Sequence, residues 1–342
     1  MKSVLLALGL AFCLASPAVA HHNWAAIYDV DGDIEFEGVI SSIEFVNPHI
    51  RIGFTVDAGT PNEMTYTTES NSVASLTRMG VTKELLAVGT PVRVAGYPSR
   101  TRDDDMFMNH LLLPSGREIV FLRTAEARWP EATRVGSADV LHGVVVEEDY
   151  SKRPTSIFGV WSTIYGAEGS HQAMRAEVQW TDYALSYQEQ VRSDGSSQEA
   201  ALESSCTRSI LGALGSPYPI QLIDNQDGTL TLHAEYYDSI RTIHLGDMPA
   251  DPVIPHEFNG HYSVGRFVGE TLVVDSLFYR EGGKDGDNYE HLIETFTLTE
   301  DHNRLQYSRV TIDPLFRSLP TFQRKWWQYV PGSFVQPYDC AY

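Results

Sequence analysis

Histidines at the expected start of the mature chain carry the clearest metal-binding chemistry in this sequence. Cleavage after Ala20 would leave His21 as the first residue, with His22 beside it. A terminal histidine offers its amine and its imidazole to one ion, and His22 or His49 could complete a site with three nitrogen ligands. Such donors suit Cu(II) and Zn(II). We therefore nominate His21, His22 and His49 as ligands of copper or zinc; a frayed terminus and a backbone-capped turn histidine are the structural alternative.

Three further residues form a softer candidate set. Met106, Met108 and His110 occupy alternate positions of an expected strand, so we expect their side chains to face the same way. Thioether and imidazole ligands could hold Cu(I) there. Packing of the methionines in a core is the competing interpretation.

Charged residues stand among apolar ones in the second half of the chain. By alternation, Arg241 shares a strand face with Ile243, Glu294 shares one with Leu292, and Asp275 shares one with Val273 and Leu277. Because a lone buried charge is costly, we expect such groups to be paired. A pocket in which Arg241 meets Glu294 or Asp275 would bind an acidic ligand or perform acid–base chemistry, and a structural ion pair is the alternative. The candidate ligand-binding residues are Arg241, His244, His261, Asp275, His291 and Glu294.

Residues 1–20 resemble a secretory signal. Lys2 gives the positive start, residues 4–15 the apolar stretch, and Ala18-Val19-Ala20 the small-residue cleavage site. The apolar stretch is shorter than the roughly 20 residues of a membrane-spanning helix, and no later stretch approaches that length. We therefore expect an exported protein, periplasmic or secreted, without a membrane span.

The composition indicates a folded, acidic protein. The 342 residues carry a formal net charge of -20, and 42% of them are hydrophobic, which is enough to bury a sizeable core. Such acidity argues against nucleic acid as a partner, because phosphates would be repelled. The chain also lacks the Gly-x-Ser-x-Gly and His-Glu-x-x-His motifs and a phosphate-binding glycine loop.

Cleavage of the signal removes Cys13 and leaves Cys206 and Cys340. In an oxidising compartment two cysteines are most simply one disulfide. It would tie the C-terminal tail to a distant loop of the same domain and contribute about 2–4 kcal/mol of stability.

Short strands separated by turns dominate the first part of the sequence. Residues 50–56 alternate like a half-buried strand, and a helix is expected over residues 73–79, before Gly80. Many short strands with one helix favour a small, closed, OB-like barrel. The other expected strands cover residues 34–45, 64–68, 91–96, 106–113 and 117–121.

The second half repeats this pattern on a larger scale. Gly159-Val160-Trp161 has the Gly-x-Trp spacing that opens lipocalin-like barrels, and residues 171–192 are expected to be partly helical. Regular strands joined by turns favour an antiparallel barrel. The expected strands cover residues 220–224, 229–237, 241–245, 262–267, 271–279, 291–299, 304–312 and 322–330.

Motifs in a fixed order resemble an exported bacterial family of unknown function. In the first half they are His21-His22-Asn23-Trp24-Ala25-Ala26, Val46-Asn47-Pro48-His49 and Val94-Ala95-Gly96-Tyr97-Pro98. In the second half they are Ser216-Pro217-Tyr218-Pro219-Ile220, Gly269-Glu270-Thr271-Leu272-Val273-Val274-Asp275 and Gln336-Pro337-Tyr338-Asp339-Cys340. The resemblance implies a domain with a His-His pair followed by a lipocalin-like domain, and it assigns no activity.

We therefore predict an all-β protein with little helix. A small OB-like barrel is expected over residues 21–125, a linker over 126–155, and a larger antiparallel lipocalin-like barrel over 156–342. The favoured function is binding of a small apolar or amphipathic ligand in the second barrel. A cofactor-independent lyase, isomerase or hydrolase using the same pocket is the first alternative, and copper or zinc binding through His21 is the second.

Overall fold

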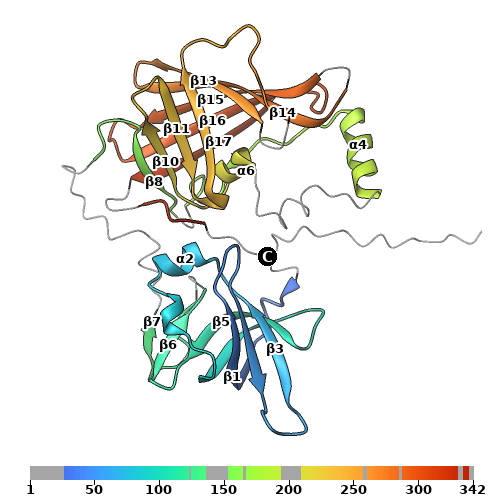
Figure 1. The fold of residues 1–342 in the computed structure, drawn as a ribbon, viewed down its shortest axis with the longest axis vertical. Coiled ribbons are helices and arrows are strands. Elements are labelled where there is room, and N and C mark those ends of the chain that lie inside the picture. The colour runs from blue at the N-terminus through green and yellow to red at the C-terminus, as the bar shows by residue number, and fades with distance from the viewer. Residues whose placement is uncertain are drawn as a thin grey trace, which may run out of the picture.

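The computed structural model describes residues 27–122, 125–135, 153–164, 167–193, 209–256, 260–284, 287–329 and 334–338. Its strands form two separate sheets, and its helices are few and short (Figure 1). In this part of the chain each sheet closes into a barrel, five-stranded in the first half and nine-stranded in the second. The prediction of an all-β protein, with a small barrel followed by a larger one, is confirmed.

The smaller barrel consists of β1 to β5, and parallel pairing of β3 with β5 closes it. Ile52 and Phe54 on β2 and Val92 and Val94 on β4 belong to one apolar core, as their two-residue spacing requires. The strands are β1 (Ile34–Glu44), β2 (Arg51–Val56), β3 (Met64–Glu69), β4 (Pro91–Pro98), β5 (Asp105–Leu112), β6 (Arg117–Val120) and β7 (Thr133–Val135).

A short helix, α2 (Val73–Arg78), and a single 3₁₀ turn, η1 (Lys83–Leu85), lie between β3 and β4. The side chain of Ser72 caps α2 by accepting a hydrogen bond from the main-chain amide of Ser75. Gly80 follows the helix with a φ of 76°, a conformation that glycine adopts without strain. The helix predicted in this position is confirmed.

The segment 125–135, most of which the sequence assigns to a linker, lies against the smaller barrel. β7 pairs in parallel with β6, and the main-chain amides of Arg128 and Trp129 donate to the carboxylate of Glu118. Residues 136–152 lie outside the described part of the chain, so the domain boundary stays a prediction.

Pairing of β16 with β17 closes the larger barrel. Every second residue points inward, as Leu230, Leu232 and Ala234 do on β11, and Trp161 and Trp327 are fully buried in the core. The strands are β8 (Gly159–Ser162), β9 (Met174–Arg175), β10 (Ile220–Asp224), β11 (Thr229–Ala234), β12 (Ser239–Leu245), β13 (His261–Val268), β14 (Thr271–Lys284), β15 (Asp287–Leu298), β16 (Arg304–Ile312) and β17 (Thr321–Tyr329).

Among the described strands of the larger barrel, one pair differs from the antiparallel arrangement that the sequence predicts. β12 and β13 run parallel, and their register joins His244 to Val264 and Leu245 to Gly265. Parallel neighbours cannot be joined by a tight hairpin, so the chain between these strands must cross over.

The helices of the second half flank the larger barrel. α4 (Asp182–Ser193) overlaps the stretch 171–192 that was expected to be partly helical and ends one residue beyond it, and α6 (Ile210–Leu214) precedes β10. Ser209 caps α6, whose residues Ile210 and Leu214 are buried in the barrel core. A 3₁₀ turn, η3 (Tyr236–Asp238), connects β11 to β12.

Several expected features fall outside the described residues. They are the signal sequence over residues 1–20, the histidines His21 and His22, and both halves of the expected disulfide, Cys206 and Cys340. In the part of the chain that the structure does describe, no helix has the length and apolar character needed to cross a membrane.

A buried carboxylate connects the two barrels. Glu235, just after β11, is fully buried and pairs with Arg78 of α2, the helix that lies on the side of the smaller barrel nearest the larger one (Figure 1). The same carboxylate accepts a hydrogen bond of 2.9 Å from the main-chain amide of Gln336. Glu235 therefore joins both barrels to the C-terminal segment.

Candidate functional site

His49 lies in the turn between β1 and β2. Its Nδ1 lies 2.8 Å from the carbonyl oxygen of Ser70 and 3.4 Å from a carboxylate oxygen of Glu69. Because a carbonyl can only accept, Nδ1 carries the proton, and Nε2 keeps a lone pair for a metal or a proton. The side chain of His49 is 39% exposed.

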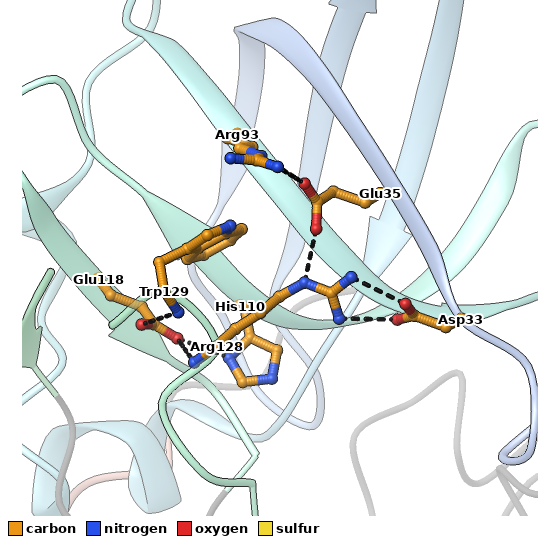
Figure 2. A network of polar contacts seen from close by, with 7 residues as sticks. All are labelled: Asp33, Glu35, Arg93, His110, Glu118, Arg128 and Trp129. Atoms are coloured by element: carbon orange, nitrogen blue, oxygen red, sulfur yellow. Dashed lines mark hydrogen bonds and ion pairs between the residues drawn. The ribbon is translucent and has the colours of Figure 1, made fainter. Parts of the chain in front are cut away.

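A buried histidine–glutamate pair lies on the smaller barrel. His110 of β5 faces Glu118 of β6 (Figure 2), and its Nδ1 lies 2.8 Å from Oε1 of Glu118. Glu118 is fully buried and also accepts the main-chain N–H groups of Arg128 and Trp129, at 2.8 and 3.1 Å. Burial lowers the pKa of His110 despite the neighbouring carboxylate, so the imidazole is neutral at neutral pH.

Arg128 extends this network to β1 (Figure 2). Its guanidinium donates to both oxygens of Asp33, at 2.9 and 2.8 Å, and to Glu35 at 2.6 Å. The hydrogen bonds from Arg128 lower the pKa of Asp33. Arg93 shares Glu35 and lies over the ring of Trp129. Each charged group of this network has a partner, so the network holds the segment 125–135 against the smaller barrel.

The expected set of Met106, Met108 and His110 is not formed. β5 carries a bulge where Met108 and His110 pair with the successive residues Gly96 and Ala95 of β4. The extra residue breaks the alternation of the strand. Both methionines therefore lie in the apolar core, whereas His110 lies outside it, and the prediction of a shared face was wrong.

Three of the expected ligand-binding residues lie on the outward side of the larger barrel. Asp275 and His291 pair with each other, with 2.7 Å between Oδ1 and Nε2, and each is about one-third exposed. His244 stacks on the ring of Tyr262, with the ring centroids 4.8 Å apart. Asp275 alternates with the buried Val274 and Ser276, which places it on the opposite face of β14.

Arg241 and Glu294 meet in the interior of the larger barrel. Both are fully buried, and Nη2 of Arg241 lies 2.6 Å from Oε2 of Glu294. Arg241 also donates to the hydroxyls of Ser263 and Ser276, at 3.0 and 2.5 Å. The other carboxylate oxygen of Glu294 accepts from the hydroxyl of Tyr307 at 2.7 Å. Both oxygens of this carboxylate are therefore in use.

One guanidinium nitrogen of Arg241 is left over. Nη1 is buried and forms no hydrogen bond with any described residue. The guanidinium lies over the ring of Phe278, on which His261 also stacks. Burial is the largest single effect on the pKa of Glu294 and raises it, but the charge and hydrogen bond of Arg241, the charge of Arg309 and the hydrogen bond from Tyr307 together hold that pKa below its ordinary value. Burial, together with the charge of Glu294, raises the pKa of Tyr307, which stays a donor.

The inward-facing side chains of Arg241 and Glu294 form one layer of the barrel interior. This layer continues on β16 and β17, in residues that the sequence patterns do not single out. Arg309 on β16 is the cross-strand partner of Glu294, and Gln323 on β17 is the partner of Arg309. Nη2 of Arg309 lies 2.5 Å from Oε1 of Gln323. Lys325 is buried two positions further along β17. Alternation with the buried Trp327 is the signal that could have placed Gln323 and Lys325 inside.

Two hollows lined by described residues lie on the larger barrel. One of about 110 Å³ lies at an end of the barrel and has apolar walls that include Ile157, Phe158, Phe267 and Leu298. The other, of about 270 Å³, lies on the outer face of β15 to β17. Its walls include Thr295, Thr297, Ser308, Phe322, Arg324 and Trp326.

Metal ligands do not cluster in the described part of the chain. No three histidine, cysteine, aspartate or glutamate side chains there lie close enough together to hold a metal ion. His21 and His22 lie outside that part, so copper or zinc binding at the terminus stays a prediction.

A family of unknown function (DUF6152) matches residues 10–106. The match covers most of the smaller barrel, up to the start of β5, and supports an uncharacterised domain there. The larger barrel lies outside the matched residues. No curated protein matches the chain.

Proposed function

We propose that this is an exported protein that binds a small amphipathic ligand inside the larger barrel. One observation carries the proposal: Arg241 is held in an apolar interior with Nη1 buried and without a partner among the described residues. A buried donor that lacks an acceptor costs about 1–3 kcal/mol, and a polar atom of a ligand would remove that cost. The secretory signal and the lipocalin-like second domain, both inferred from the sequence, support the same function.

The contacts of the interior support binding rather than acid–base catalysis. Both oxygens of Glu294 are bonded and its pKa is held low, so this carboxylate is a poor general base. Asp275 and His291 pair with each other on the outward side, away from Arg241. We therefore favour a binding protein over a lyase, isomerase or hydrolase.

The hollow at the barrel end offers a place for the apolar part of the ligand. Leu298 lines it, and Phe296 and Glu294 follow along the inward face of β15. At the usual rise of a strand, Leu298 and Glu294 are about 13 Å apart. Phe296, Tyr307 and Trp327 fill the layer between them, so a ligand that reaches Arg241 must displace some of these rings.

Titration with 1-aminoanthracene, a neutral apolar fluorophore, tests the proposal, with decanol as the competitor. We expect saturable binding to the purified mature protein, and decanol should displace the fluorophore. Leu298→Trp fills the hollow at the barrel end and should abolish binding. Thr297→Trp, on the outer face of the same strand, fills the other hollow and should leave binding intact. The reverse pattern would place the ligand outside the barrel and contradict the proposal.

Copper or zinc binding by the mature N-terminus is a second candidate function, favoured by the position of Tyr28. The hydroxyl of Tyr28 lies 3.5 Å from one carboxylate oxygen of Glu69, and the other oxygen lies 3.4 Å from His49. The chain from His21 to Tyr28 can span up to about 25 Å, so His21 is within reach of His49.

Metal titration tests this second candidate. Copper and zinc are added to protein cleaved after Ala20 and to a variant with one extra alanine before His21. We expect tight binding that the extra residue abolishes and that His49→Ala weakens, whereas His233→Ala, in the larger barrel, has no effect. Equal affinity in all four proteins would overturn the terminal site.

A further inference from the structure

We infer that the larger barrel contains an anion-binding subsite, formed by Arg309, Gln323 and Lys325 with Arg175 at its edge, that receives the carboxylate of an amphipathic ligand. The inference rests on the proposed function and names the chemical class of the ligand. Neither the family match nor the motifs of the sequence point to these four residues.

Strand register brings the four residues together. Arg309 on β16 faces Gln323 on β17, and Gln323 faces Arg175 on β9. Lys325 follows on the inward face of β17, opposite Tyr307. The subsite thus spans three adjacent strands and continues the layer that holds Arg241 and Glu294.

The polar ends of these side chains converge at the turn after α6. Lys325 donates to the main-chain carbonyl of Ser216. A Cβ atom at Gly215 would lie 2.6 Å from Nη2 of Arg175 and 3.5 Å from Nε2 of Gln323, so both groups face this glycine. A side chain at Gly215 would displace the guanidinium of Arg175 and contact Gln323, which makes the turn one wall of the subsite.

The cations of the subsite have no matching acid. Arg175, Arg309 and Lys325 form no ion pair with a carboxylate of the described residues, and Glu294, the acid in the layer, is already bonded to Arg241. With Lys325 protonated, the layer of Arg241, Arg309 and Lys325 outnumbers Glu294 by two charges. Since the whole chain has a formal net charge of -20, this excess of positive charge is a local arrangement and not a consequence of composition.

Two hydrogen-bond donors of the subsite are buried and unused. Nε of Arg309 and Nε2 of Gln323 have no partner among the described residues, and Gln323 is only 4% exposed. Nε1 of Trp327, whose ring lies 5.0 Å from the amine of Lys325, is a third such donor. Because buried donors in folded proteins are nearly always bonded, these three require an acceptor that the described residues do not supply.

The protonation of the cations agrees with an anion as the missing partner. Burial lowers the pKa of Lys325 to about 7. Burial, and then the charge of Arg309, lower the pKa of Arg175. A negative charge placed among these groups would stabilise both charged forms, as nearby opposite charges do.

The surroundings define the rest of the ligand. Guanidinium, amide and ammonium groups are the donors that carboxylate oxygens accept from. The neighbouring side chains of Tyr307 and Trp327 are aromatic, and Nη1 of Arg309 lies 3.5 Å from the main-chain carbonyl oxygen of Leu211. A single carboxylate on an apolar chain or ring therefore matches the site.

Decanoate and decanol share an alkyl chain and differ in the headgroup. Calorimetric titration of the mature protein with each compound therefore measures the contribution of the subsite to the affinity. We expect decanoate to bind about tenfold more tightly or better at neutral pH, as a charge-assisted hydrogen bond implies. Arg309→Met and Lys325→Met should each remove most of this preference, measured as the ratio of the two affinities in the same variant. Arg324→Met, on the outer face of β17 between Gln323 and Lys325, should keep it.

The possible results separate the subsite from the proposed function. Equal affinity of the wild-type protein for both compounds would overturn the subsite and leave ligand binding in the barrel standing. Binding of neither would overturn both. Arg309→Lys keeps the charge and should retain the preference for decanoate. This control distinguishes loss of the charge from misfolding as the cause of a lost preference in Arg309→Met. An equal loss of preference in Arg324→Met would indicate a general effect of charge and would also overturn the subsite.

Discussion

Arg241 and Glu294 form an ion pair of 2.6 Å in the interior of the larger barrel, and both side chains are fully buried. Hydroxyl groups of Ser263, Ser276 and Tyr307 complete most of the hydrogen bonds of the pair. Nη1 of Arg241 stays unbonded among the described residues. The contacts of the pair therefore hold Arg241 in place and leave Nη1 as a donor for the polar group of a ligand.

Removing one partner of this pair should be costly. Glu294→Gln leaves the charge of Arg241 buried without compensation, which lowers the free energy of unfolding by about 3–5 kcal/mol. The double variant Arg241→Met with Glu294→Leu should recover much of that loss. Urea denaturation measures all three, with the exposed Glu300→Gln as the control, expected within about 0.5 kcal/mol of wild type. A loss in Glu294→Gln no larger than in the control would contradict the role of the pair.

The affinity for decanoate should depend on pH through Lys325. The pKa of this amine in the free protein is about 7, and a bound carboxylate favours the protonated amine. Above pH 7 binding must therefore take up a proton, and the affinity should fall by up to about tenfold per pH unit. Calorimetry in buffers of different ionisation enthalpy measures the number of protons that the protein takes up when decanoate binds. Lys325→Arg should bind decanoate without this pH dependence, and a dependence that persists there would assign it to another group.

Lys325 should also make stability depend on pH in the absence of ligand. Its pKa falls from 10.5 to about 7 on folding, so the unfolded chain binds the proton more strongly between these values. The free energy of unfolding should therefore rise as the pH rises from about 7 towards about 10. In Lys325→Met this contribution is absent, and urea denaturation over that range compares the two proteins. A difference between them that stays constant with pH would refute the shift.

Glu118 should control local opening of the segment 125–135. Glu118→Ala removes the acceptor of the Arg128 and Trp129 amides and the partner of His110. A loss of about 1–3 kcal/mol per buried group predicts that both amides exchange with solvent roughly five- to 160-fold faster. Hydrogen exchange measures the rates, and Arg117→Ala, at an exposed neighbouring position, is the control. Unchanged exchange in Glu118→Ala would mean that other contacts hold the segment.

Most of both barrels could be predicted from the sequence because apolar residues at every second position mark each strand. Leu230, Leu232 and Ala234 on β11 are one example, and the helix after Ser72 was recognised from its own spacing. The parallel pairing of β12 with β13 could not be predicted in this way. It depends on the path of the crossover and leaves no local pattern in either strand.

The site was less predictable than the fold. Alternation relates a residue to its own strand but does not say which face is inward, so Asp275 was grouped with Arg241 although it lies on the outer face of β14. A single bulge reversed the expected orientation of His110 relative to Met108. Lys325 carries a charge, as exposed strand positions usually do, and its alternation with the buried Trp327 is the sequence signal that it faces the interior.

Nuclear magnetic resonance of the tryptophan indole groups tests the central claim most directly. Nε1 of Trp327 is buried in the larger barrel without an acceptor among the described residues. Trp326 donates to the carbonyl of Glu168 at 3.0 Å and Trp180 is 41% exposed, so both serve as internal controls. Saturation with decanoate should shift the indole resonance of Trp327 strongly and leave those of Trp180 and Trp326 nearly in place. A shift of Trp180 or Trp326 with Trp327 unchanged would contradict ligand binding inside the barrel.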